Sequence, residues 1–183
     1  MLIDSHVNLH AEAFDADREA VIARARAAGV TLMVTICDRI ASVPAVLAIA
    51  GAHDDIWASV GQHPHNAKER PDLGAGELIA FAKHARVAGI GETGLDLHYN
   101  LSPLDQQIAS FRAHIEAARA LDLPLIVHTR DADDLTGDIL EDEHAKGPFR
   151  LLMHCYTSGE RLARRALDLG AVFSLSGILT FKA

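Results

Sequence analysis

Short apolar segments alternate with longer amphipathic segments along all 183 residues of the chain. The apolar segments are rich in Val, Ile and Leu, and most lack an alternation of polar and apolar positions. Such segments are typical of strands in a parallel sheet that is covered on both faces. The predicted strands are Leu2–His6, Leu32–Cys37, Ile56–Gly61, Val87–Glu92, Leu125–His128, Leu151–His154 and Val172–Ser176.

Amphipathic helices are predicted between these strands. The clearest one follows Ser102, a suitable N-cap, and Pro103, which is favoured in a first helical turn. Its apolar side chains recur at steps of three and four residues, which places them on one helix face. These side chains are Leu104, Ile108, Phe111, Ile115 and Ala118. The other predicted helices are Asp15–Ala28, Ala41–Ala50, Glu77–His84, Asp133–Glu143 and Ser158–Leu169.

The regular β-α alternation indicates an α/β fold, either a doubly wound open sheet or a (β/α)8 barrel. The Gly-rich fingerprint of a dinucleotide-binding fold does not follow the first predicted strand, which favours the barrel. No linker, repeat or low-complexity segment interrupts the pattern. We therefore predict one TIM-barrel-like domain over residues 1–183.

Composition and charge limit the functional classes. A formal net charge of −8 argues against a broad basic surface that coats nucleic acid, although a bound cation can attract a phosphate locally. No apolar run is long enough to cross a bilayer and the N-terminus lacks signal-peptide features, so a cytoplasmic protein without a membrane partner is expected. Cys37 and Cys155 are expected to be buried, reduced thiols.

Histidines and carboxylates follow five of the predicted strands, in the stretches DSHVN, SVGQHPH, GIGETGLD, LIVHTR and LLMHCY. A single histidine at a strand end is usually a hydrogen-bonded structural residue. In a (β/α)8 barrel, however, the carboxyl ends of all strands meet at one rim. Burying several polar groups there costs free energy unless they share partners, and a metal ion is one such partner. The pattern therefore predicts a metal site at this rim.

The residue types restrict the metal. Imidazole nitrogen and carboxylate oxygen together suit Zn²⁺, Mn²⁺, Fe²⁺ or Ni²⁺, and carboxylate-rich variants accept Mg²⁺. Glu92 is the one carboxylate predicted directly at a strand end, and a carboxylate can bridge two cations. We expect one or two divalent ions, because two bridged ions can stabilise the attacking and leaving oxygens of a phosphodiester.

Six stretches occur in one order along nearly the whole chain: LIDSHVNLH, VGQHPHNA, GIGETGLDLHYN, PLIVHTRDA, LMHCYTSG and SLSGILTFK. In these stretches the chain resembles the TatD-type metal-dependent deoxyribonucleases, within the wider amidohydrolase-like hydrolases. The resemblance implies a metal-dependent hydrolase of phosphodiester bonds that acts on DNA as a 3'-5' exonuclease. It also implies a (β/α)8 barrel with two metal sites that share one glutamate.

The resemblance assigns roles to individual residues. It implies one complete metal site of Glu92, His128 and His154, with Glu92 also the catalytic residue. His6 is expected to support a second ion. Three further residues are expected to contact substrate, and they are His63, His65 and Arg130.

The chain departs from the family pattern at the second ion. The family's H-x-H-x-D appears as His6-Val7-Asn8-Leu9-His10, so Asn8 is a weak ligand candidate and His10 stands where Asp is usual. The eighth strand and a metal-binding Asp are expected beyond SLSGILTFKA. We therefore expect seven of eight strands in this chain, with the barrel completed by a homo-oligomer or a further C-terminal segment.

Two other functions remain open at this point. The altered first motif is consistent with a catalytically silent relative that acts as a binding or assembly component. A hydrolase of C–N or C–O bonds in small molecules would use a similar rim with a different pocket, and the fold alone does not choose among these chemistries.

Overall fold

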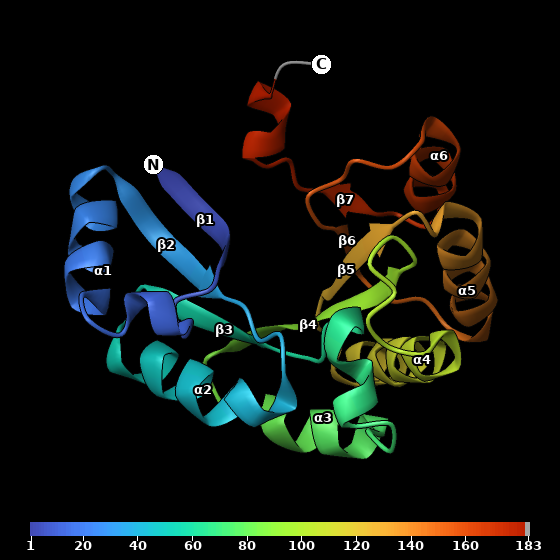
Figure 1. Ribbon diagram of the computed structural model, residues 1–183, viewed down its shortest axis with the longest axis horizontal. Coiled ribbons are helices and arrows are strands. Elements are labelled where there is room, and N and C mark those ends of the chain that lie inside the picture. Colours follow the sequence, from blue (N-terminus) through green and yellow to red (C-terminus); the bar gives the residue numbers. More distant parts are fainter. Residues whose placement is uncertain (182–183) are drawn as a thin grey trace.

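Each predicted apolar segment forms a parallel strand of one curled sheet. The computed structural model describes residues 1–181, and its seven strands pair in sequential order from β1 to β7. The strands are β1 (Leu2–Val7), β2 (Val30–Thr35), β3 (Ile56–Val60), β4 (Val87–Asp96), β5 (Leu125–Arg130), β6 (Leu151–Met153) and β7 (Val172–Phe173). The sheet curls into part of a barrel (Figure 1), which confirms the predicted TIM-barrel-like fold with seven strands.

Six helices connect the strands and lie along the outer side of the curled sheet (Figure 1). They are α1 (Arg18–Ala27), α2 (Val43–Ala52), α3 (Ala75–Ala82), α4 (Leu104–Leu121), α5 (Asp133–Lys146) and α6 (Glu160–Asp168). Short 3-10 turns occur at Glu12–Phe14, Ile40–Ser42, Pro64–Glu69 and Gly177–Thr180. All six predicted helices are present, with ends that differ by up to three residues.

The start of α4 differs from the prediction. The helix begins at Leu104 with Pro103 as its cap residue, and Ser102 makes no capping bond. The Ser102 hydroxyl instead donates to the backbone oxygen of His65 and accepts from the backbone N–H of Lys68. Ser102 therefore makes a tertiary contact, although its local sequence preference is to cap the helix.

Strand β4 is longer than predicted. The sequence placed its end at Glu92, but pairing with β5 continues to Asp96 after a register shift between Ile90 and Thr93. Gly91 and Gly94 both have a φ of +136°, and a Cβ atom at Gly94 would overlap the backbone oxygen of His128. Glycine is required at this close approach, so the chain beyond Glu92 continues as an irregular strand.

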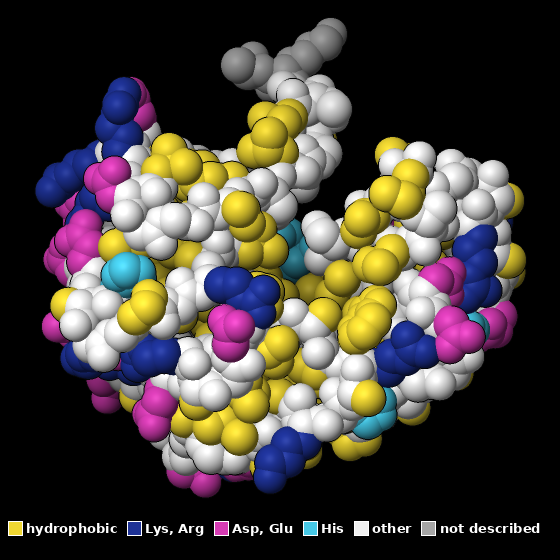
Figure 2. Space-filling model, turned by 180° about the vertical axis from the view of Figure 1, so that it is seen from behind, with side chains coloured by type: hydrophobic (Ala, Val, Ile, Leu, Met, Phe, Trp, Pro, Cys, Tyr) yellow, Lys and Arg dark blue, Asp and Glu magenta, His cyan; other side chains and the backbone are white. Residues whose placement is uncertain are grey.

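The two edges of the sheet are more exposed than the centre. Strands β3 to β6 are largely buried, as predicted, whereas Leu2 and Ile3 of β1 and Val172 of β7 are 57 to 62% exposed. The prediction of strands buried on both faces is therefore wrong for the edges. Figure 2 shows hydrophobic side chains on both sides of the opening between the two ends of the sheet.

Both cysteines are free, as predicted, but only Cys37 is buried and Cys155 is partly exposed. Within residues 1–181 no helix combines the length and the apolar character that a membrane crossing requires.

Candidate metal centre

Four histidines surround one buried glutamate at the carboxyl ends of the strands. His6 lies in β1, His63 follows β3, His128 lies in β5 and His154 follows β6, while Glu92 lies within β4. Parallel pairing brings these strand ends to one rim, so residues that are distant in sequence become neighbours.

The carboxylate of Glu92 is the centre of this cluster and the residue is only 8% exposed. Its Oε2 lies 3.2 Å from Nε2 of His6. Its Oε1 lies 3.4 Å from Nδ1 of His128, 3.9 Å from Nε2 of His63 and 4.0 Å from Nε2 of His154. One carboxylate therefore faces nitrogen atoms from four different β/α units.

The imidazoles divide into two groups around Glu92. Among the described residues, three sets have ligand atoms that all lie within 4.8 Å of one another: His6 with Glu92 and His154, His63 with Glu92 and His128, and His65 with Asp96 and His128. The sequence had placed His128 and His154 on one ion with Glu92. The structure brings both near Glu92 but in separate sets, and their roles as ligands remain predictions.

The protonation states suit a cation. Burial alone raises the pKa of Glu92, but the imidazoles of His128 and His6 outweigh burial and hold the pKa well below its usual value. Burial lowers the pKa of His154 to about 4, despite the attraction of Glu92, so this imidazole is neutral and keeps a lone pair for a metal. The cluster thus combines the ionised carboxylate of Glu92 with the neutral imidazole of His154. Burial opposes protonation of His128, but its contacts with Glu92 and Asp96 outweigh burial and raise its pKa.

The donor set fits a divalent metal ion. Ligand atoms that share a zinc-like ion lie about 2.0–2.2 Å from it, so they are at most about 4.4 Å apart, and small side-chain rotations satisfy this within sets that span 4.8 Å. The Nδ1 atom of His6 is buried and has no hydrogen-bond partner among the described residues. The Glu92 cluster can therefore hold a divalent metal ion.

A second carboxylate, Asp96, was missed by sequence reasoning. Its Oδ2 lies 2.8 Å from Nε2 of His65 and 3.0 Å from Nε2 of His128, and its Oδ1 accepts from the backbone N–H of Tyr99 at 2.7 Å. Burial raises the pKa of Asp96, but these donors outweigh burial and bring the pKa to about 2. The sequence could have indicated Asp96 as a site residue, because positions 92 and 96 of an extended strand lie on the same face as each other.

His63 is oriented as a hydrogen-bond donor. It caps the turn Pro64–Glu69, where its Nδ1 accepts the backbone N–H of His65 at 3.2 Å. Burial lowers the pKa of His63 to about 4, so the ring is neutral and its single proton is on Nε2. That N–H faces Glu92, which leaves His63 without a free lone pair for a metal.

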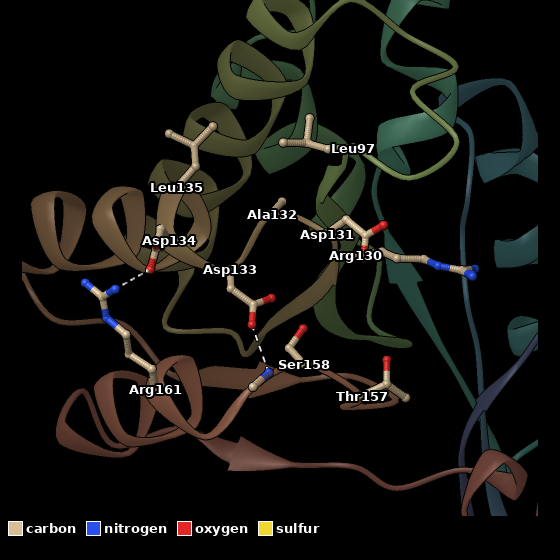
Figure 3. A pocket seen from close by; sticks show the side chains of 11 residues that line it. Leu97, Arg130, Asp131, Ala132, Asp133, Asp134, Leu135, Thr157, Ser158 and Arg161 are labelled. Carbon is tan, nitrogen blue, oxygen red and sulfur yellow. Dashed lines mark hydrogen bonds and ion pairs between the residues drawn. The ribbon is translucent and has the colours of Figure 1, made fainter. Parts of the chain in front are cut away.

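Arg130 lies farther out on the rim. Its guanidinium is exposed, stacks 4.8 Å from the ring centre of Tyr99 and forms no ion pair within the part of the chain that the structure describes. It borders a hollow of about 830 Å³ between the starts of α5 and α6. Figure 3 shows its side chain extending away from Asp133 and Asp134, so its charge is free to meet an anion.

Asn8 lines a hollow that no residue of the Glu92 cluster lines. It is exposed and shares this hollow with His10 and Asp38. His10 forms an ion pair with Asp38, with 2.9 Å between Nε2 and Oδ1. The altered first motif is therefore divided, since His6 contacts Glu92 whereas His10 pairs with Asp38 in the segment that follows β2.

Comparisons with known proteins agree with this geometry. The family described as TatD related DNase matches residues 3–183. The metal-dependent hydrolase YabD of Bacillus subtilis, described as uncharacterized, is 35% identical over 182 residues, which are 100% of this chain and 71% of YabD. The 3'-5' ssDNA/RNA exonuclease TatD of Cronobacter sakazakii is 35% identical over 176 residues, which are 96% of this chain and 66% of that protein.

A solved structure supports the same assignment. The crystal structure of YjjV, a TatD homologue of Escherichia coli K12, has a TM-score of 0.89 and 26% identity, and the match covers 98% of this chain and 70% of YjjV. The relatives are named as metal-dependent hydrolases and exonucleases, and this chain spans about two thirds of their length or slightly more. By sequence and by fold, the chain belongs to the TatD-related DNase family.

Proposed function

We propose that this protein is a divalent-metal-dependent hydrolase that cleaves phosphodiester bonds of single-stranded nucleic acid. The observation that carries the proposal is the contact of one buried carboxylate, Glu92, with imidazoles from four β/α units. A similar protein is named as a 3'-5' exonuclease on ssDNA and RNA, which supports this substrate class. The names of the relatives, which are metal-dependent hydrolases and exonucleases, favour hydrolysis over a silent binding role.

We assign the metal ligands as Glu92, His6, His128 and His154. Glu92 is shared, His6 and His154 approach it from β1 and β6, and His128 approaches through Nδ1. Bound Mg²⁺, Mn²⁺ or Zn²⁺ supplies Lewis-acid stabilisation of the negative charge that develops on the phosphate. Asn8 is at most a weak contributor, since it is exposed and borders a different hollow.

The remaining site residues bind and orient the substrate. We assign a phosphate contact to the Nε2–H of neutral His63, which also faces Glu92, and a bidentate contact with a second phosphate to the exposed guanidinium of Arg130. His65 is held by Asp96 at the same rim, next to Tyr99. These groups bind an anionic chain locally on a protein whose net charge is −8.

The test is digestion of a 5'-labelled single-stranded oligonucleotide with added Mg²⁺ or Mn²⁺. We expect shortening from the 3' end by the parent, and a loss of at least about a hundredfold in Glu92→Ala and His128→Ala. Glu116→Ala, which removes an exposed glutamate of α4, serves as the matched control and keeps parental activity. Equal digestion by the parent and both site variants would refute the proposal.

We further propose that additional polypeptide covers the open edges, with a second copy of this chain as its source in solution. Strands β1 and β7 each have one unpaired edge, and exposed apolar side chains follow both. Unpaired edges with apolar surroundings favour association. Light scattering should show a dimer, whereas a compact, well-behaved monomer at the same concentration would contradict this proposal.

A further inference from the structure

An exposed aromatic side chain lies beside the metal centre, in the turn that follows β4. Tyr99 is 54% exposed, and within residues 1–181 only Phe181, which follows the turn Gly177–Thr180, is a comparably exposed aromatic residue. An exposed ring gives up the free energy that its burial would provide. Exposure alone does not make a binding site, so the contacts of Tyr99 decide its role.

The turn that carries Tyr99 is held to its neighbours on both sides. The backbone N–H of Tyr99 donates to Oδ1 of Asp96 at 2.7 Å. Nδ1 of His98 lies 2.9 Å from Oδ2 of Asp131, which ties the turn to the segment that follows β5. A tyrosine that is already held in place loses little conformational entropy when a ligand packs against it.

A row of rings connects Tyr99 with the metal centre. The ring centres of Tyr99 and His65 are 5.4 Å apart, and those of His65 and His128 are 6.0 Å apart. Nδ1 of His128 lies 3.4 Å from Oε1 of Glu92. Two imidazoles therefore separate Tyr99 from the carboxylate at the centre of the cluster. A nucleic acid strand with one phosphate at this cluster has a neighbouring nucleotide within reach of Tyr99.

Arg130 packs against the ring of Tyr99. Its guanidinium carbon lies 4.8 Å from the ring centre, and Arg130 is itself exposed. A guanidinium that stacks through its flat face keeps the N–H groups at its edge for a phosphate. More than half of Tyr99 stays exposed in spite of this contact and the neighbouring imidazoles. The pair therefore offers an aromatic surface for a base next to a positive charge for a phosphate.

We infer that Tyr99, supported by Arg130, stacks on one unpaired base of single-stranded nucleic acid. The inference rests on the proposed function for its class of ligand, and it adds the side chain that recognises an unpaired base. Every base has a flat π face, so stacking of this kind tolerates any sequence. A base inside a duplex is already stacked on its neighbours, whereas an unpaired base is free to stack on a protein side chain. Tyr99 therefore favours single strands over duplexes.

The test is the binding of two labelled strands of equal length in the presence of Mg²⁺, measured by fluorescence anisotropy. One is ordinary single-stranded DNA, and the other has the same sugars and phosphates without bases. Phosphorothioate linkages protect both strands from hydrolysis. The variants are Tyr99→Ala, Tyr99→Leu and Tyr99→Phe, and the control is Leu167→Ala, which removes another exposed apolar side chain from α6.

We expect the parent to bind the strand with bases about tenfold more tightly than the strand without them, as is typical of one base stacked on an aromatic ring. Tyr99→Ala and Tyr99→Leu should lose this difference and bind the abasic strand as the parent does. Tyr99→Phe keeps the ring, so it should bind both strands as the parent does. Leu167→Ala should also match the parent.

Equal affinity of the parent for the two strands, or binding of neither, overturns the inference. An equal loss of affinity for both strands in Tyr99→Ala also overturns it, because the effect would then lie in the phosphate contact of Arg130. A base preference that Leu167→Ala reduces as much as Tyr99→Ala has the same meaning.

Digestion of an unprotected strand separates this inference from the proposed function. A parent that shows the expected base preference but digests no strand refutes the proposed function alone. A parent that digests the strand, with an unchanged base preference in Tyr99→Ala, refutes this inference alone.

Discussion

We predict that acid destabilises this protein through His114, a fully buried histidine of α4 that lies outside the metal centre. Its Nε2 accepts the backbone N–H of Gln62 at 2.9 Å, and its Nδ1–H donates to the backbone oxygen of Ser110 at 2.7 Å. These two bonds require the neutral ring. Burial lowers the pKa of His114 from 6.5 to about 4, against a smaller opposing effect of the bond to Ser110.

The sign and size of the acid effect on the free energy of unfolding follow from proton binding. In the unfolded chain His114 takes up a proton as the pH falls below 6.5, whereas in the folded chain it does so only near pH 4. The free energy of unfolding therefore decreases as the pH is lowered from about 6.5, and the contribution of neutral His114 is lost completely below about pH 4. Each pKa unit corresponds to about 1.4 kcal/mol, so the expected loss from this residue is about 3 kcal/mol.

The assay is urea unfolding at several pH values between 7.5 and 4, with His114→Gln as the partner variant. Glutamine can accept from Gln62 and donate to Ser110, but it does not titrate. We expect the parent to lose about 3 kcal/mol more than the variant over this range. Other histidines with lowered pKa, such as His63 and His154, act equally in both proteins. Parallel stability curves for the two proteins would refute the reasoning.

Two further predictions concern backbone and charge. Gly94→Ala should lower the free energy of unfolding by more than about 2 kcal/mol, because Gly94 has a positive φ and the new Cβ would overlap the backbone oxygen of His128. Gly51→Ala is the control, and it should be neutral or stabilising because Gly51 lies in α2 with open space around it. Equal thermal unfolding of the two alanine variants would contradict this. The side chain of Glu143 is 7% exposed and pairs with three basic side chains, so Glu143→Ala should lower the free energy of unfolding by about 2 kcal/mol. The side chain of Asp142 is 53% exposed, so Asp142→Ala should lower it by less than about 1 kcal/mol, as measured by chemical unfolding. A similar cost for both acidic positions would show that burial is not the deciding factor.

The sequence was sufficient to predict the architecture because the patterns that indicate strands and helices are both local. Apolar runs near Ile56 and Leu125 predict strands, and amphipathic stretches such as Leu104–Leu121 predict the helices between them. Connections of this length impose parallel pairing of successive strands. The sequential strand order and the gathering of histidines at one rim follow from these rules.

The details that the sequence did not predict all depend on tertiary contacts. The glycines around Glu92 indicate a turn by local preference, but pairing with β5 keeps the chain extended to Asp96. Ser102 has the chemistry of a helix cap, yet it bonds to the backbone of His65 instead. The separation of His128 from His154 around Glu92 depends on ring orientations, which spacing along the chain does not encode.

Binding of Mn²⁺ to the metal-free protein, with Glu92→Gln and Glu116→Ala measured beside the parent, shows whether the Glu92 cluster is a metal site. We expect the parent and Glu116→Ala to bind one or two ions with equal affinity. We expect Glu92→Gln to bind about a hundredfold more weakly or not at all, since loss of a supporting group alone costs about 10- to 100-fold in metal affinity. Equal binding by the parent and Glu92→Gln, or no binding by the parent, would show that Glu92 does not hold a metal ion.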